Sequence, residues 1–234
     1  MRLALASQGF TTDEIAKKIE ELVGKPLEKI NIAIINEAYV GLDETRDKRW
    51  LIKELANIEK YIGGMIDFVN FRAYDKEEIK RHLERADLIY IVGGRQHILE
   101  KLFRETDTID ILKQMANEKV IMGTSAGSIV LGRKITSTNF WKERYPKDLE
   151  DAKTHEELNF VNFNIIPHYM REDHKKWTKD FFERVLKDNL FPVYAIKDTQ
   201  MIVYKDGELE FVGGNPEVFG KKKIQKEKIG KATN

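Results

Sequence analysis

The sequence predicts an α/β fold, a three-layer α/β/α sandwich with a mostly parallel central sheet. Short apolar runs alternate with amphipathic segments from the first residues onward, and glycine pairs follow two of these segments. Each apolar run has the length of a buried strand, and the amphipathic segments are long enough to connect parallel strands as helices. The 234 residues suit one domain. We expect this domain to cover residues 1–220 and a charged tail to follow at 221–234.

The apolar runs predict strands because turn-forming residues bound them and β-branched residues are frequent within them. The expected strands cover residues 2–7, 30–36, 65–70, 87–92, 120–122, 164–167, 193–196, 200–204 and 208–212.

Start and stop signals predict the helices. Thr11 and Glu14 have the spacing of a capping box, and Gly24 closes the helix that they open. Asp75 opens another helix, with Glu78 three residues later. The Asp75 helix is expected to cover residues 75–85. Further helices are expected over residues 43–61, 96–104, 109–117 and 171–187, and a polar surface excursion over 140–157.

Composition narrows the classes of function. Lysine and arginine number 40 against 39 acidic residues, so no overall basic field attracts nucleic acid. The absence of cysteine excludes disulfides, thiolate nucleophiles and cysteine metal sites. No apolar run is long enough to span a membrane. We therefore expect a cytoplasmic protein, monomeric or homodimeric, without membrane or nucleic-acid partners.

The most informative stretch is the G-x-S-x-G pentad from Gly123 to Gly127, which follows an apolar strand and precedes a short helix. Such a turn exposes the central serine at the sheet edge and directs the first N–H groups of the helix toward its target. Ser125 is therefore a candidate nucleophile. The alternative is a serine that caps the helix.

A serine nucleophile requires a base, and a third group usually orients that base. His168 is the candidate base because it follows the apolar run 164–167 and so lies at the same sheet edge; a structural histidine is the alternative. Asp198 is the favoured acid because it lies between two apolar strands, where a carboxylate needs a partner. It could instead be a turn residue. The other candidate acids are Glu156, Glu157 and Asp173, and the histidine could also act without an acid.

Backbone N–H groups are candidates for stabilising an oxyanion. Ala126 follows the nucleophile and Gly94 ends the neighbouring strand, so their N–H groups are the two candidate donors. We expect Gly93 and Thr124 to line the substrate site. The double glycine could also be no more than a tight turn.

The order of these motifs resembles the peptidase E (aspartyl dipeptidase) and cyanophycinase family of serine peptidases. That order is Gly93-Gly94, then the pentad, then Pro167-His168-Tyr169, then Asp198. The resemblance implies a flavodoxin-like fold of the class I glutamine amidotransferase-like superfamily. It also implies Ser125 as nucleophile, His168 as base, an oxyanion hole at Gly94 and Ala126, cleavage of short peptides after an N-terminal aspartate, and no metal or organic cofactor.

Three departures from the family pattern stand out. Phe140 occupies the position of a catalytic aspartate in the family, and Arg95 follows the double glycine where the family has asparagine. Arg171 resembles an arginine that binds the substrate aspartate, but the loop around it is shorter; it could bind a substrate carboxylate or pair with Glu172 or Asp173. The alternative function is therefore a non-catalytic binding or regulatory protein on the same fold.

Overall fold

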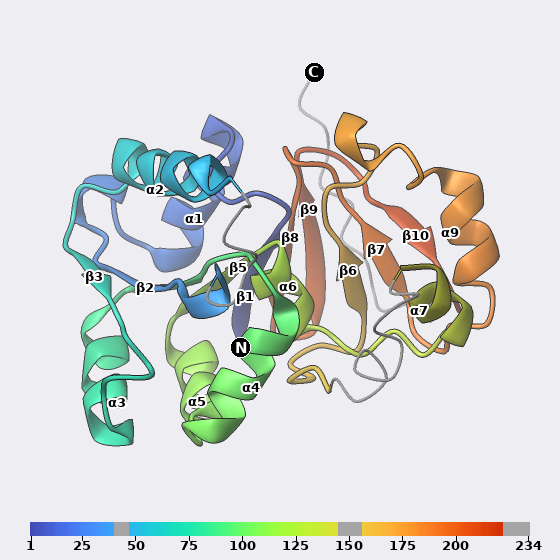
Figure 1. Ribbon diagram of the computed structural model, residues 1–234. Helices are drawn as coiled ribbons and strands as arrows, with labels where there is room; N and C mark the ends of the chain where they lie inside the picture. Colours follow the sequence, from blue (N-terminus) through green and yellow to red (C-terminus); the bar gives the residue numbers. More distant parts are fainter. Residues whose placement is uncertain (40–46, 145–155, 222–234) are drawn as a thin grey trace.

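The computed structural model describes residues 1–39, 47–144 and 156–221 (Figure 1). In this part of the chain a mixed sheet of seven strands has the order β3-β2-β4-β5-β1-β8-β9, and a second sheet of three strands has the order β10-β7-β6. The strands of the large sheet are β1 (Arg2–Ala6), β2 (Ile32–Ile35), β3 (Ile66–Phe68), β4 (Leu88–Ile91), β5 (Val120–Thr124), β8 (Met201–Lys205) and β9 (Glu208–Val212). Those of the small sheet are β6 (Asn164–Ile166), β7 (Val193–Ala195) and β10 (Glu217–Phe219).

The large sheet confirms the predicted mostly parallel architecture. β1 pairs in parallel with β5, which places Leu3 opposite Ile121, and β4 joins β5 to β2 in the same direction. Only β8 and β9 run antiparallel to their neighbours in this sheet of the described chain. The carboxyl ends of β1, β4 and β5 therefore meet at one edge, where ligands of such sheets bind.

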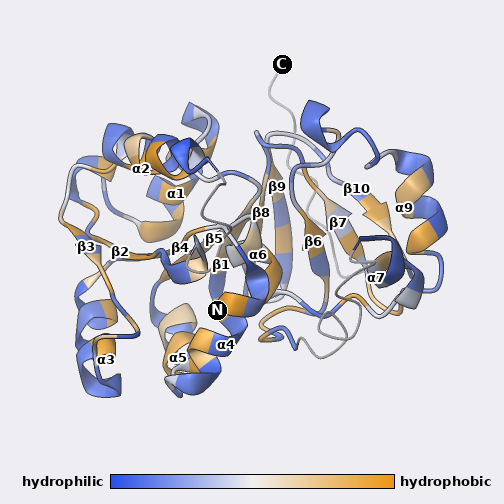
Figure 2. Cartoon of the chain, viewed as in Figure 1, coloured by the Kyte–Doolittle hydropathy of each residue, from blue (hydrophilic) through white to orange (hydrophobic). Residues whose placement is uncertain are grey.

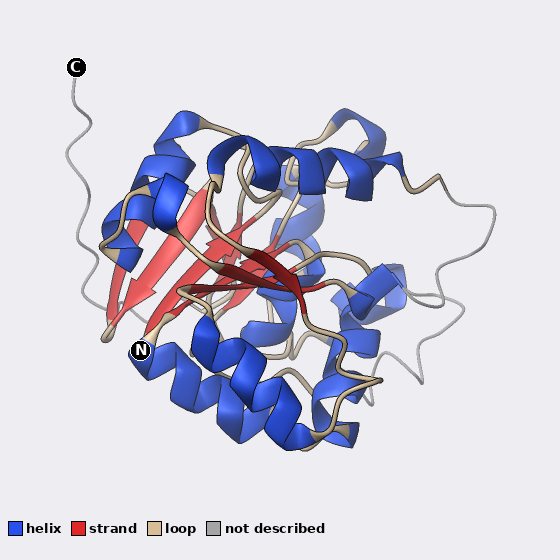
Figure 3. Ribbon diagram, turned by 90° about the vertical axis from the view of Figure 1, so that its left-hand side faces the viewer, coloured by secondary structure: helices blue, strands red, loops and turns tan. Residues whose placement is uncertain are grey.

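Helices cover both faces of the large sheet (Figure 3). Side chains alternate along each strand, so Val120 and Met122 face one core while Ile121 faces the other. The first core includes α1 (Asp13–Val23) and α2 (Arg49–Tyr61). The other includes α3 (Lys76–Arg85), α4 (Gln96–Glu105), α5 (Ile109–Glu118) and α6 (Ala126–Leu131). Figure 2 shows the matching pattern, with hydrophobic colour along the inner strands and hydrophilic colour on much of α3.

Most predicted helix signals are confirmed, with one shift. Asp75 caps α3, and its capping box with Glu78 is complete. Gly24 ends α1 in the left-handed conformation, with φ of 76°. The cap of α1 is Thr12 rather than the expected Thr11, because the Thr11 hydroxyl donates to the backbone oxygen of Asp198 at 2.8 Å.

Two predicted segments differ from the structure. The helix expected over 171–187 is divided into a short 3-10 turn, η3 (Glu172–His174), and α9 (Lys179–Val185), because the Thr178 side chain caps a new helix start. The polar excursion instead begins with α7 (Thr138–Arg144), whose Phe140 and Trp141 are buried against α9 and the small sheet.

Some predicted features lie outside the described residues. They are residues 43–46 of the helix expected at 43–61, the middle of the excursion at 145–155, and the charged tail beyond Lys221. In the described part of that helix, residues 47 and 48 are not helical and α2 begins at Arg49.

Candidate active site

Ser125 sits in a sharp turn between β5 and α6. Its φ of 50° and ψ of −113° lie in a region that non-glycine residues rarely adopt, at a cost of about 1–3 kcal/mol. Two glycines make this turn sterically feasible. A Cβ atom at Gly127 would lie 2.2 Å from the Ile91 carbonyl oxygen, and one at Gly123 would lie 2.5 Å from the Gly127 oxygen. The pentad therefore folds as a strained elbow packed directly on β4.

A hydrogen-bonded chain links the Ser125 hydroxyl to a carboxylate through an imidazole. Ser125 Oγ lies 2.9 Å from His168 Nε2, and His168 Nδ1 lies 2.6 Å from Asp198 Oδ1. The His168 and Asp198 side chains are 15% and 26% exposed, so the chain is partly shielded from solvent but can be reached from it. This is the arrangement in which a base activates a hydroxyl and an acid orients the base.

The two sheets supply different members of this chain. Ser125 follows β5 of the large sheet, whereas His168 follows β6 of the small sheet, and Asp198 lies in the connection from β7 to β8. The predicted position of His168 at the end of a strand is correct, but the strand belongs to the second sheet. His168 itself has a positive φ of 61°, which turns the chain sharply after β6.

Ser7 is a residue of this cluster that the sequence did not reveal. It is fully buried directly after β1, and its hydroxyl donates to Asp198 Oδ1 at 2.8 Å. Ser7 Oγ in turn accepts the backbone N–H of His168 at 2.8 Å. A polar residue at the carboxyl end of a buried central strand was the available signal, because β1 ends beside β5 at the edge where Ser125 lies.

The surroundings favour an ionised Asp198. Burial alone would raise the pKa of this carboxyl. Burial is outweighed by the hydrogen bonds from His168 and Ser7 together with the charges of His168 and of Arg171, whose Nη1 lies 3.8 Å from Asp198 Oδ2. The pKa of Asp198 is therefore below its ordinary value, so the group is charged at neutral pH.

The double glycine lies beside Ser125. A Cβ atom at Gly93 would come within 2.9 Å of the Ser125 Cβ and 3.4 Å of its Oγ, so a side chain there would crowd the hydroxyl. Gly94, with φ of 146°, lies so close to Ala38 that a Cβ atom would be 2.4 Å from the Ala38 oxygen. Ala126 is the first residue of α6, and the first N–H groups of a helix have no intrahelical acceptor. Gly93 thus lies beside the Ser125 hydroxyl, and Ala126 directly follows Ser125 in the chain.

Thr124 differs from its predicted place at the substrate. Its side chain is fully buried beneath the elbow, and its hydroxyl donates to Glu54 Oε1 at 2.6 Å. The same oxygen accepts the Tyr90 hydroxyl at 2.9 Å. Burial raises the pKa of Glu54, although both hydrogen bonds oppose this effect. Thr124 therefore anchors the elbow from below.

Arg171 adopts the second of its two predicted roles. Its Nε and Nη2 donate to the two carboxylate oxygens of Asp173 at 2.6 and 3.0 Å, and Nη2 also lies 2.8 Å from His174 Nε2. Burial and the Arg171 charge lower the pKa of His174. The guanidinium is thus already paired, although it stays close to Asp198.

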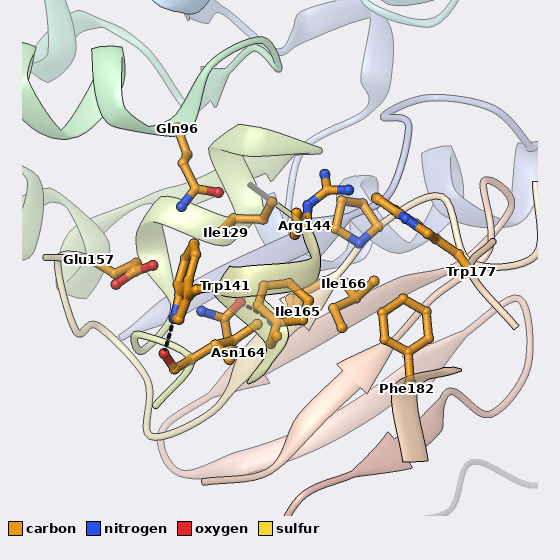
Figure 4. A pocket seen from close by; sticks show the side chains of 13 residues that line it. Gln96, Ile129, Trp141, Arg144, Glu157, Asn164, Ile165, Ile166, Trp177 and Phe182 are labelled. Atoms are coloured by element: carbon orange, nitrogen blue, oxygen red, sulfur yellow. Dashed lines mark hydrogen bonds between the residues drawn. The ribbon is translucent and has the colours of Figure 1, made fainter. Parts of the chain in front are cut away.

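The remaining candidate acids lie away from His168. Asp173 is bound by Arg171, and Glu156 is exposed and lies 3.4 Å from Arg104. Glu157 is buried in a separate pocket formed by α7, β6 and their neighbours (Figure 4). Among the described residues, no group of three or more His, Asp or Glu side chains is arranged to hold a metal ion.

Comparison with known proteins identifies the family of this chain. The family model described as peptidase family S51 matches residues 3–212. The chain belongs to peptidase family S51. Within the described residues, no helix combines the length and apolar character needed to cross a membrane.

Relatives of the S51 chain include named peptidases. It is 28% identical over 134 residues to an uncharacterized peptidase of Listeria innocua, covering 57% of this chain and 62% of that protein. It is 25% identical over 187 residues to peptidase E of Haemophilus influenzae, covering 76% of this chain and 74% of the relative. The chain spans slightly less than two thirds of the length of the two Listeria peptidases that it matches.

Solved structures share the fold. A protein from Listeria monocytogenes EGD-e that is assigned to peptidase E superposes with a TM-score of 0.66 at 18% identity, covering 94% of this chain and 98% of that one. A peptidase from an acI-B1 Actinobacterium gives a TM-score of 0.60 at 21% identity, covering 94% and 87% of the two chains. The predicted sandwich is therefore confirmed.

Proposed function

We propose that this protein is a serine peptidase that hydrolyses short peptides, including peptides with an N-terminal aspartate. The hydrogen-bonded chain from Ser125 through His168 to Asp198 is the observation that carries the proposal. Membership of peptidase family S51 supports the reaction class. The resemblance to aspartyl dipeptidases supports the substrate class.

The first half-reaction forms an acyl-enzyme. Ser125 Oγ attacks the scissile carbonyl carbon while His168 Nε2 accepts the hydroxyl proton. The carbonyl oxygen becomes an oxyanion, which the N–H groups of Ala126 and Gly94 stabilise; one such donor is worth about 3 kcal/mol. His168 then donates its proton to the leaving amine as the C–N bond breaks.

The second half-reaction restores the enzyme. A water molecule gives a proton to His168 and attacks the acyl carbon, and the returning proton releases Ser125 as the peptide acid departs. Asp198 holds the imidazole in the tautomer that presents Nε2 to the serine and stabilises the imidazolium in both steps.

Replacement of the nucleophile tests the proposal. We expect Ser125→Ala to abolish hydrolysis of aspartyl dipeptides, and a fluorophosphonate probe to label the native protein but not this variant. Unchanged turnover in Ser125→Ala would refute the assignment. A folded native protein that does not react with the probe would favour the non-catalytic alternative.

The proposal extends to the setting in which the enzyme works. We propose one peptidase domain over residues 1–220, a cytoplasmic location, a monomeric or homodimeric state and no nucleic-acid partner. The balance of 40 basic and 39 acidic residues supports the last point, because it leaves no net positive field.

A further inference from the structure

A buried carboxyl group lies beneath the elbow and takes no part in the proposed reaction steps. Glu54 belongs to α2, which packs on one face of the large sheet, and its side chain is buried there. Its Oε1 accepts the Thr124 hydroxyl at 2.6 Å and the Tyr90 hydroxyl at 2.9 Å. Burying a carboxyl group is costly unless hydrogen bonds offset the cost. We therefore looked for what these two bonds hold in place.

Both strands that Glu54 contacts lead into the active site. Thr124 is the last residue of β5 and directly precedes Ser125. Tyr90 lies in β4, the strand that the double glycine at Gly93 follows. Both side chains are fully buried, so neither hydroxyl can exchange Glu54 for solvent. A single side chain of α2 thus ties together the two strands that carry the nucleophile and the double glycine.

The loop after β1 closes the third side of this cluster. A Cβ atom at Gly9, which has φ of 68°, would lie 2.0 Å from the Tyr90 hydroxyl and 3.4 Å from Thr124 Cγ2. The loop therefore packs directly on both partners of Glu54. The same loop begins with Ser7, which bonds Asp198. The cluster is thus in contact with the segment that supports the proposed acid.

The conformation of Ser125 requires support from its surroundings. Its φ of 50° and ψ of −113° persist only where neighbouring groups hold the backbone. Two N–H groups of α6 donate to the Ser125 oxygen at 3.0 and 3.1 Å, and the Ser125 N–H donates to the Ala6 oxygen at 3.1 Å. The bond from Thr124 to Glu54 fixes the preceding residue from the opposite side.

We propose that Glu54 is a positioning residue for the nucleophile: by accepting the Thr124 hydroxyl, it holds Ser125 in the conformation that presents Oγ to His168. The inference rests on the proposed peptidase function. Glu54 touches no reacting atom, so its effect passes through Thr124 and the backbone of the elbow. The essential property is an acceptor oxygen at this point beneath β5.

The electrostatics of Glu54 leave the acceptor in place. Burial raises the pKa of Glu54, whereas the hydrogen bonds from Thr124 and Tyr90 and the charge of a protonated His168 lower it. Oε1 accepts both hydroxyls, and an amide oxygen can do the same. Replacement by glutamine therefore separates the acceptor from the charge.

Two substitutions at Glu54 test the inference. Glu54→Leu removes the acceptor, and we expect kcat to fall by about tenfold or more with little change in KM, since Glu54 is buried. Glu54→Gln keeps an acceptor and should restore most of the lost rate. The rate of fluorophosphonate labelling should follow kcat in both variants, because labelling needs a correctly placed Ser125. A native kcat in Glu54→Leu, or an equal loss in Glu54→Gln, would overturn the inference.

A double-mutant cycle tests the route through Thr124. Thr124→Val keeps the shape of the side chain without its hydroxyl, and alone it should lower kcat by about tenfold. Combined with Glu54→Leu it should cause little further loss, because both changes break the same hydrogen bond. Losses that multiply would overturn this route. Thr124→Val also carries the test if Glu54→Leu does not fold, since it leaves the bond from Tyr90 to Glu54 intact.

Ile58→Ala is the matched control. Ile58 is buried one turn further along α2, so this variant weakens the packing of the same helix without touching the elbow. It should lower Tm and leave kcat and the labelling rate at their native values. A loss of kcat in Ile58→Ala as large as that in Glu54→Leu would mean that loosening α2 alone explains the effect, and would overturn the inference.

Crystal structures of Glu54→Leu and Thr124→Val separate this inference from the proposed function. We expect the Ser125 backbone to leave its positive φ, or Ser125 Oγ to move out of hydrogen-bonding distance of His168 Nε2, which is 2.9 Å away in the native protein. A displaced elbow would support the positioning role even if the native protein hydrolysed no peptide. An unchanged elbow in both variants would overturn it and leave Ser125-dependent hydrolysis intact.

Discussion

Replacing Ser7 by alanine tests the contribution of a residue that touches no reacting atom in the proposed mechanism. Its hydroxyl bonds both the Asp198 carboxylate and the backbone N–H of His168, each at 2.8 Å. Ser7→Ala removes both bonds at once, and the alanine methyl can replace neither. The imidazole and the carboxylate then lose a shared anchor, while Ser125 keeps all its own contacts.

The expected magnitude follows from the charged bond. A hydrogen bond to an ionised group contributes about 1.5–3 kcal/mol, and about 1.4 kcal/mol corresponds to a tenfold change in rate. If Asp198 loses this support in the transition state, kcat should fall by about 10- to 150-fold. KM should change little, because Ser7 is fully buried and does not meet the peptide.

Steady-state kinetics on an aspartyl dipeptide would measure the effect, together with the rate of fluorophosphonate labelling. Labelling requires activation of Ser125 by His168, so its rate should fall by the same factor as kcat. Ser137→Ala is the matched control: Ser137 is also buried, and its hydroxyl donates to the Val185 oxygen, in contact with neither His168 nor Asp198. Both variants should lower Tm, but only Ser7→Ala should slow catalysis.

Two results would refute this reasoning. A native kcat in Ser7→Ala would mean that the hydroxyl does not support the imidazole. An equal loss of kcat in Ser137→Ala would mean that destabilisation alone explains the loss.

Two further variants test the groups around the elbow. Asp198→Asn should lower kcat by about 10⁴-fold, since an amide holds the imidazole in the wrong tautomer, and a pH–rate profile with a near-native kcat would exclude Asp198 as the orienting acid. Glu54→Gln keeps an acceptor for Thr124 and Tyr90 but removes a carboxyl whose pKa is raised by burial. Glu54 contributes stability that is fully present below its unfolded-state pKa of about 4.3 and is lost as pH rises through its raised folded pKa. Urea unfolding at pH 4 and pH 8 should therefore show a less favourable change in stability on raising the pH for the native protein than for Glu54→Gln; equal changes would contradict the argument.

The alternation of apolar runs with amphipathic segments, and the turn-forming residues between them, predicted the large sheet well. Local signals such as the capping box at Asp75 and the left-handed Gly24 act over a few residues, so they survive in the folded protein. The segment after Pro167 was predicted poorly as one long helix. Thr178 caps a second helix start there, and the sequence alone does not reveal that the chain must first turn at His168.

The choice among several candidate acids for His168 was predictable from their positions relative to the expected strands. Asp198 was the favoured acid, and its contact with His168 agrees with that choice. Ser7 and Glu54 were not predicted, because their roles depend on strand order and on which helix covers the elbow. The partner of the Arg171 guanidinium could not be decided from the sequence. Both the Asp173 carboxylate and a substrate carboxylate can accept two hydrogen bonds from it.

The division of the cluster between two sheets has a mechanical consequence. Ser125 follows a strand of the large sheet and His168 follows a strand of the small sheet. The 2.9 Å between Ser125 Oγ and His168 Nε2 therefore depends on how the two sheets pack against each other. Tyr194 of β7 and Phe211 of β9, whose ring centroids lie 5.8 Å apart, belong to the packing that joins the two sheets. A small shift of one sheet relative to the other would therefore separate the Ser125 hydroxyl from His168 Nε2, even if every strand stayed folded.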